Sequence, residues 1–255
     1  NLVTEFTYDG KPHKVTYDNN DNVNILELNN KEEINVGSYD YEIIVKDDYY
    51  QGNISGKFII KKAKLNIILP TITKEYTNGF SLTIDDIVKH KDFKILGNYV
   101  SLDDLNLSLV TKVTSAGKHT YEIKSNSTNY DCTFTEGEAI IDKGNINIDL
   151  PPTISSAFYL DKLGDLTLIN NTFDTGAFIF KDPEIIIDKV GTYKVTLVFM
   201  PNDRNNYNTF EKEIEITVSK KILYLNDYLI NDTFTYDAKK HSLIFDFKEY
   251  SNLIK

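Results

Sequence analysis

The feature that most constrains this sequence is an internal repeat. The segment Phe6–His13 reads FTYDGKPH, and it returns as FTYDAKKH at Phe234–His241, from position 6 to position 234. That spacing of 228 residues is close to three periods of about 76 residues. A sequence that copies itself at this interval is expected to fold as a series of small domains, each of which buries its own small core.

A glycine-led strand provides a second marker of the same period. Three glycines are each followed by alternating apolar and polar residues, as in Tyr193, Val195 and Leu197; these are Gly37, Gly117 and Gly191. Alternation with a period of two is typical of a strand that is buried on one face only. Each copy is therefore predicted to contain such a strand at the same place.

A tyrosine follows each of these strands after a turn. Tyr50 follows Gly37 at the same interval at which Tyr130 follows Gly117. Tyr207 follows Gly191 at a longer interval, because a longer turn, 201–206, precedes it. The recurrence of this tyrosine predicts a structural corner, in which the ring is packed and the hydroxyl bonds back to the chain.

The markers divide the chain into three copies and part of a fourth. The predicted ranges are 1–63, whose first strand is truncated, then 64–143, 144–220 and the partial copy 221–255. No Gly/Ser-rich linker separates them, which predicts limited flexing between copies. Since the chain begins at Asn1 within a copy, we expect it to be a piece of a longer parent with more copies.

The predicted fold class is all-β: tandem immunoglobulin-like antiparallel β-sandwich modules in an elongated array. Short strands separated by turn signals favour this fold, and 17 Tyr and 14 Phe among 255 residues suit pleated sheet. A helical pattern at 84–89, which Ser81 or Thr83 could cap, leaves β-grasp-like modules with one short helix each as an alternative. At roughly 30–40 Å per copy, the three copies would form a rod about 100–140 Å long.

Composition excludes several classes of function. The net charge of −10 argues against binding to nucleic acid, and no apolar stretch is long enough for a membrane helix. A single cysteine cannot form an internal disulfide or a cysteine-based zinc site. No nucleophile–base pair, phosphate loop or metal-ligand spacing is present, so we expect no enzyme activity, no catalytic residues, no metal and no cofactor.

The first copy resembles the bacterial surface repeats of the MBG or YDG type. The resemblance rests on Tyr8–Pro12 with Gly10 inside it, on Val36–Tyr39, on the aromatic turn that ends at Tyr50, and on Lys61–Ala63. The second and third copies keep only the latter half of the pattern, from Gly117 and from Gly191 onward. The resemblance implies immunoglobulin-like modules in large secreted or wall-attached proteins, often adhesins, and it supplies no catalytic residues.

Three residues are candidates for binding. Tyr49 lies at a turn and does not recur in the other copies, so its ring could stack on a sugar. Asp203 and Asn205 offer oxygen atoms in the long third turn, although their spacing matches no calcium loop.

The sequence therefore predicts a non-catalytic stalk segment of an extracellular, bacterial cell-surface protein, which projects a functional tip and bears load. The alternative is a module that binds glycan or host protein through its loops. The expected partners of this chain are neighbouring repeats in the same chain. Other parts of the parent protein are expected to bind host glycan or host protein.

Overall fold

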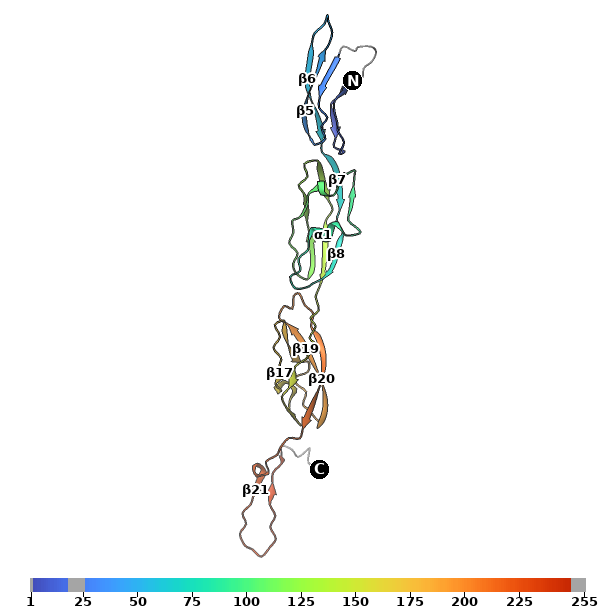
Figure 1. Cartoon of the computed structure of the whole chain (residues 1–255). Coiled ribbons are helices and arrows are strands. Elements are labelled where there is room, and N and C mark those ends of the chain that lie inside the picture. The colour runs from blue at the N-terminus through green and yellow to red at the C-terminus, as the bar shows by residue number, and fades with distance from the viewer. Residues whose placement is uncertain (1, 18–25, 249–255) are drawn as a thin grey trace. The chain divides into compact units, whose positions relative to one another are not determined.

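The chain is all-β, as the sequence predicts. The computed structural model describes residues 2–17 and 26–248, and within them the only α-helix is α1 (Ile84–Val88). Contacts divide the chain into two compact units. Figure 1 labels α1 in the first unit and β19 and β20 in the second. Unit 1 comprises residues 1–145 together with 203–208, and unit 2 comprises residues 146–202 together with the chain from 209 onward. The boundaries expected near residues 63, 143 and 220 stay predictions.

The first sheet of unit 1 has four strands in the order β2–β6–β5–β4. These strands are β2 (Glu5–Thr7), β4 (Leu26–Asn30), β5 (Gly37–Val45) and β6 (Asn53–Lys61). The predicted glycine-led strand is β5, which forms a long hairpin with β6. Strands β1 (Leu2–Val3) and β3 (Thr16–Tyr17) form a separate, short antiparallel pair.

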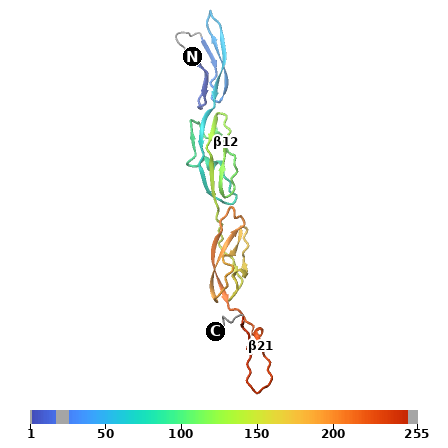
Figure 2. The ribbon, with the colours of Figure 1, turned by 180° about the vertical axis from the view of Figure 1, so that it is seen from behind.

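Strand β6 leads almost directly into β7, and the remaining strands of unit 1 follow. Three sheets are present, with the orders β13–β7–β9, β11–β14–β8 and β10–β12; β12 is labelled in Figure 2. The bounds are β7 (Ala63–Ile68), β8 (Thr71–Glu75), β9 (Lys94–Leu96), β10 (Leu107–Leu109), β11 (Gly117–Tyr121), β12 (Ile123–Ser125), β13 (Tyr130–Phe134) and β14 (Gly137–Asp142), with a 3₁₀ turn, η1, at Asp103–Leu105.

Helix α1 is short because its ends are fixed locally. Thr83 is the N-cap, and its hydroxyl accepts a hydrogen bond from the Asp86 backbone N–H, while the Asp86 carboxylate accepts one from the Thr83 backbone N–H. The helix predicted from residues 84–89 is therefore confirmed. Since it occurs in only one of the predicted copies within the described residues, the alternative fold with one helix in each copy gains no support.

Unit 2 repeats the arrangement of the first sheet. Its four strands have the order β16–β20–β19–β18, and a two-stranded pair, β15–β17, accompanies them. The bounds are β15 (Thr153–Ile154), β16 (Ala157–Phe158), β17 (Leu168–Ile169), β18 (Gly176–Phe180), β19 (Gly191–Pro201) and β20 (Phe210–Ser219), with η2 at Leu163–Asp165. Further on lie η3 (Leu225–Tyr228), β21 (Leu229–Asn231) and β22 (Ile244–Phe245).

The repeated octapeptide has the same local structure at both of its positions. The rings of Phe6 and His13 stack with centroids 4.7 Å apart, and those of Phe234 and His241 also stack at 4.7 Å. His13 Nε2 lies 2.8 Å from the Asp9 carboxylate, and the corresponding distance from His241 to Asp237 is 2.7 Å. The repeated histidines therefore contact residues of their own octapeptide, which is a structural role within the loop.

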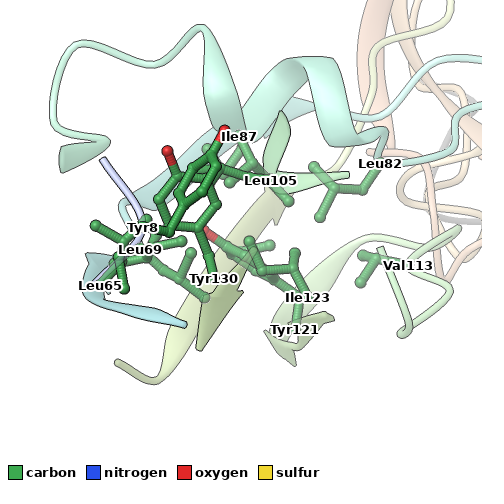
Figure 3. Packing of buried hydrophobic residues seen from close by; sticks show 14 of the residues in the cluster. Tyr8, Leu65, Leu69, Leu82, Ile87, Leu105, Val113, Tyr121, Ile123 and Tyr130 are labelled. Carbon is green, nitrogen blue, oxygen red and sulfur yellow. The ribbon is translucent and has the colours of Figure 1, made fainter. Parts of the chain in front are cut away.

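The buried side chains form two clusters, one in each unit. In unit 2 the aromatic rings of Phe178, Phe199 and Phe210 project from neighbouring strands of the four-stranded sheet and contact one another. In unit 1 a single cluster contains residues from both 1–63 and 64–143, for example Phe58 and Ile141; part of this cluster is drawn in Figure 3. The expectation of a separate core for each copy is therefore wrong for these two ranges.

The join between the two ranges has a simple physical cause. Only Lys62 separates β6 from β7, so the buried side chains of Ile60, Ala63 and Leu65 follow one another along the chain. Apart from Ala63, the first residue of β7, each sheet draws its residues from one predicted range. Burial is continuous across the join while strand pairing is not.

Candidate functional site

The first recurring feature is a parallel pairing between the second strand and the closing strand of each predicted copy. Strand β2 pairs with β6, β8 pairs with β14, and β16 pairs with β20, all in parallel. The predicted antiparallel sandwich therefore also contains parallel pairs, because the second strand of each copy lies beside the closing strand after the chain has crossed over. The remaining pairs in the two four-stranded sheets are antiparallel.

A fourth parallel pair, β7 with β13, lies within range 64–143 apart from Ala63. A tyrosine extends each of the other three parallel pairs by one hydrogen bond. The backbone N–H of Tyr8 donates to the carbonyl of Lys61 at 2.9 Å. The equivalent bonds run from Tyr76 to Asp142 at 2.8 Å and from Tyr159 to Ser219 at 2.9 Å. Tyr8, Tyr76 and Tyr159 therefore hold equivalent positions at the end of the strand pair.

The second recurring feature is a turn that binds the end of such a strand pair. In unit 1 the Asn129 side-chain oxygen accepts a hydrogen bond from the Val36 N–H at 3.0 Å, and its main-chain carbonyl accepts one from the Ala63 N–H at 3.1 Å. The Lys62 ammonium donates to the Ser127 carbonyl at 3.2 Å. We call this set of contacts the first junction.

The same set of contacts occurs once more within unit 1, in the next period of the repeat. The Asn206 side-chain oxygen accepts from the Ala116 N–H at 2.7 Å, and its carbonyl accepts from the Gly144 N–H at 2.9 Å. The Lys143 ammonium donates to the Arg204 carbonyl at 2.6 Å. Each contact of this second junction has its counterpart in the first.

A pair of tyrosine rings closes each junction. Tyr8 meets Tyr130 edge to face with ring centroids 5.2 Å apart, and Figure 3 shows the two side chains next to each other. Tyr76 meets Tyr207 in the same geometry, also at 5.2 Å. Such pairs favour the edge-to-face arrangement. Burial raises the pKa of the Tyr130 hydroxyl, which accepts a hydrogen bond from the Val100 N–H.

The first predicted copy presents a different turn. Tyr49 and Tyr50 have exposed fractions of 90% and 72%, and neither ring contacts another ring in the described part of the chain. The Asp47 carboxylate holds the turn by accepting hydrogen bonds from the backbone N–H groups of both tyrosines. Tyr50 is thus unlike its counterparts Tyr130 and Tyr207, and it forms no packed corner.

Asp203 and Asn205 lie in the turn of the second junction. Both carboxylate oxygens of Asp203 accept hydrogen bonds from Asn206, one from its backbone and one from its side-chain amide. Asp203 thereby orients the asparagine that makes the junction, whereas Asn205 is exposed. Among residues 2–17 and 26–248, no cluster of three His, Cys, Asp or Glu side chains could hold a metal ion.

The glycine markers occupy strand starts and one turn. Gly37, Gly117 and Gly191 open β5, β11 and β19. Gly191 has a φ of +112°, with open space where a Cβ would lie. Gly10 has a φ of +75°, and a Cβ there would clash with a methyl carbon of Val100.

Sequence reasoning missed the residues that make the junctions. It singled out Tyr130 and Tyr207 but not the asparagine directly before each. Part of the signal was available: the dipeptide Asn-Tyr occurs at 129–130 and at 206–207, after the strands that begin at Gly117 and Gly191, although it also occurs at 98–99. The first copy has Tyr49 in place of that asparagine.

Comparisons with known proteins give little further information. No family model matches the chain, and no curated protein matches its sequence. Among solved structures, the chain is similar at 12% identity and a TM-score of 0.17 to an endo-fucoidan hydrolase of glycoside hydrolase family 107. That match covers 86% of this chain and 43% of the hydrolase, so the chain spans less than half of that protein's length. In the described residues, no helix is both apolar and long enough to span a membrane.

Proposed function

We propose that this chain is a non-catalytic stalk segment of a large bacterial cell-surface or secreted adhesin-like protein, and that it bears mechanical load. The observation that carries the proposal is the parallel pairing of the second strand with the closing strand in all three predicted copies. The sequence resemblance to surface repeats supports the extracellular location.

Parallel pairing of these two strands resists a pull applied along the chain. Tension pulls the second strand of a copy toward its N-terminal end and the closing strand toward its C-terminal end. In a parallel pair these forces slide one strand along the other, so several hydrogen bonds must break together. The pair β8–β14 has five residues in register and β2–β6 has three, so range 64–143 is expected to resist more strongly.

The two junctions support the same proposal. Each fixes a turn to the end of a strand pair through two backbone N–H groups, one ammonium and one aromatic ring. The residues that directly follow Lys61 and Asp142 are therefore themselves hydrogen-bonded to a junction turn, and these bonds also have to break under tension.

Single-molecule pulling between the two ends of the chain tests the proposal. We expect unfolding against measurable force in steps of about 25 nm, because a copy of about 77–80 residues releases about 3.3–3.6 Å per residue less its folded length. Forced unfolding reports the unfolding rate, which is the property a load-bearing segment needs. Smooth extension without resolved force peaks would contradict the proposal.

A second candidate function rests on the exposed Tyr49–Tyr50 turn. Two adjacent exposed aromatic rings offer apolar faces to a sugar. A glycan array tests this directly, with Tyr49→Ala as the variant and Tyr236→Ala, another tyrosine with an exposed fraction of 92%, as the matched control. Absence of any hit, or equal binding by both variants, would remove this candidate.

A further inference from the structure

Unit 2 contains the counterpart of the strand-pair end that each junction turn binds. The Ser219 carbonyl accepts a hydrogen bond from a tyrosine N–H, as the carbonyls of Lys61 and Asp142 do. The two residues that follow Ser219 in the chain therefore correspond to the two that follow Lys61 and the two that follow Asp142. Val190 precedes Gly191 as Val36 precedes Gly37 and as Ala116 precedes Gly117. The residues of unit 2 that correspond to a junction are Tyr159, Val190, Lys220 and Lys221, and we call them the base of unit 2.

The base of unit 2 has the groups of a junction without the turn. Among the described residues, the backbone N–H groups of Val190 and Lys221 and the Lys220 ammonium have no hydrogen-bond partner. Val190 is 50% exposed and Lys221 is exposed, whereas Ala63 and Gly144 are buried at the two junctions. The Tyr159 ring makes no ring contact within the described part of the chain and is half-buried.

We propose that the base of unit 2 is a docking site for a β-hairpin turn that carries the dipeptide Asn-Tyr, as presented by a further module of the same kind. This rests on the proposed function. The asparagine side chain and carbonyl accept from the N–H groups of Val190 and Lys221, the Lys220 ammonium binds a carbonyl of the turn, and the tyrosine ring meets Tyr159. The argument is the continuity with two junctions that have this composition and geometry.

The chemistry of the base selects the asparagine. Val190 and Lys221 present two N–H donors that one residue must satisfy with a side-chain oxygen and a main-chain carbonyl, as Asn129 and Asn206 do. The turn of the first copy has Tyr49 at that position, and its only side-chain acceptor is the phenol oxygen at the far end of the ring, which cannot take the place of the asparagine amide oxygen close to the backbone. If a second molecule of this chain docks through its Tyr49–Tyr50 turn, we therefore expect weaker binding than that of an Asn-Tyr turn.

A titration followed by NMR tests the proposal on the full chain. The probe is a cyclised hairpin peptide that copies residues 197–212, whose end residues are paired in β19 and β20. Because only a few hydrogen bonds and one ring contact form, the dissociation constant is expected to be on the order of 1 mM. We expect saturable shifts of the Val190 and Lys221 amides, and a peptide with Asn206→Ala should bind at least about 5-fold more weakly.

Controls separate a specific site from general attraction. The chain variant Lys220→Ala should weaken binding, whereas Lys240→Ala, at another exposed lysine, should not. Equal shifts with both peptides, or no shift of the two amides at about 5 mM peptide, would overturn the proposal. If the peptide fails while pulling still gives force peaks, only the docking site is refuted; if pulling gives none, the stalk function is refuted whatever the peptide does.

Discussion

Replacing Asn129 with alanine removes the side chain that organises the first junction while keeping its main-chain bond. The lost contacts are the acceptor for the Val36 N–H at 3.0 Å and the donor to the Asn35 side chain at 3.1 Å. The main-chain carbonyl of residue 129 still accepts from Ala63. The variant therefore isolates what the asparagine side chain contributes.

The expected loss of stability is about 2 kcal/mol, because a half-buried N–H that loses its partner costs about 1–2 kcal/mol and the exposed bond to Asn35 adds a few tenths. For a cooperative unit of this size, a loss of about 1 kcal/mol lowers Tm by about 2–4 °C, so unit 1 should melt about 4–8 °C lower. Asn129→Asp keeps the acceptor for Val36 and should lose less than half as much.

Differential scanning calorimetry measures the melting of unit 1, and hydrogen exchange of the Val36 amide reports the junction itself. Asn126→Ala is the matched control, because Asn126 lies in the same turn and its side chain makes no hydrogen bond in the described structure. If Asn129→Ala and Asn126→Ala melt at the same temperature and exchange Val36 equally fast, the junction adds nothing to stability and the reasoning is refuted.

Three further predictions follow from the backbone and from charge. Gly191→Ala should destabilise unit 2 alone by about 1–2 kcal/mol, since the positive φ disfavours any side chain; calorimetry that shows an equal loss in unit 1 would contradict this. Ala238→Gly should stabilise its loop by a few tenths of a kcal/mol, because Ala238 has a φ of +61° where Gly10 stands in the first copy; slower exchange of the Lys239 amide would show it, and faster exchange would count against it. Burial of Asp86 acts to raise its pKa, but hydrogen bonds from Lys74 and Thr83 outweigh this and hold it below its ordinary value of 3.8; in calorimetry, unit 1 should therefore lose stability as the pH falls below that ordinary value, and a loss of equal size in Asp86→Asn would contradict this.

The fold class could be predicted because alternation and turn residues are local signals. The glycine-led strands at Gly37, Gly117 and Gly191 all appear where alternation places them. The capped helix at Ile84–Val88 was equally visible, since Thr83 and Asp86 have the spacing of a capping box.

The parallel strand pairs could not be predicted, because pairing partners are set by the path of the chain between them. Glu5 and Ile59 are far apart in the sequence, and nothing local in either strand specifies that they lie side by side. The continuous burial across Lys62 was missed for a related reason. The direct connection through Lys62 is visible in the sequence, but contacts between the two ranges, such as that of Tyr8 with Tyr130, are not.

The junctions could have been predicted in part. Their composition is visible as a repeated Asn-Tyr dipeptide, but the role of Asn129 depends on which N–H groups the fold leaves unpaired. Val36 and Ala63 need an acceptor only because β5 begins and β6 ends next to them. Tyr50 shows the limit of the same reasoning. It holds the same repeat position as Tyr130 and Tyr207, yet its ring is exposed.

Small-angle X-ray scattering of the full chain tests most directly whether the copies extend reach. A rod of about 100–140 Å, at about ten residues of strand per copy, has a radius of gyration of about 30–40 Å. A compact globule of the same 255 residues has one of about 18 Å. We expect the value of the rod, and a measured radius of gyration equal to that of the globule would contradict the account.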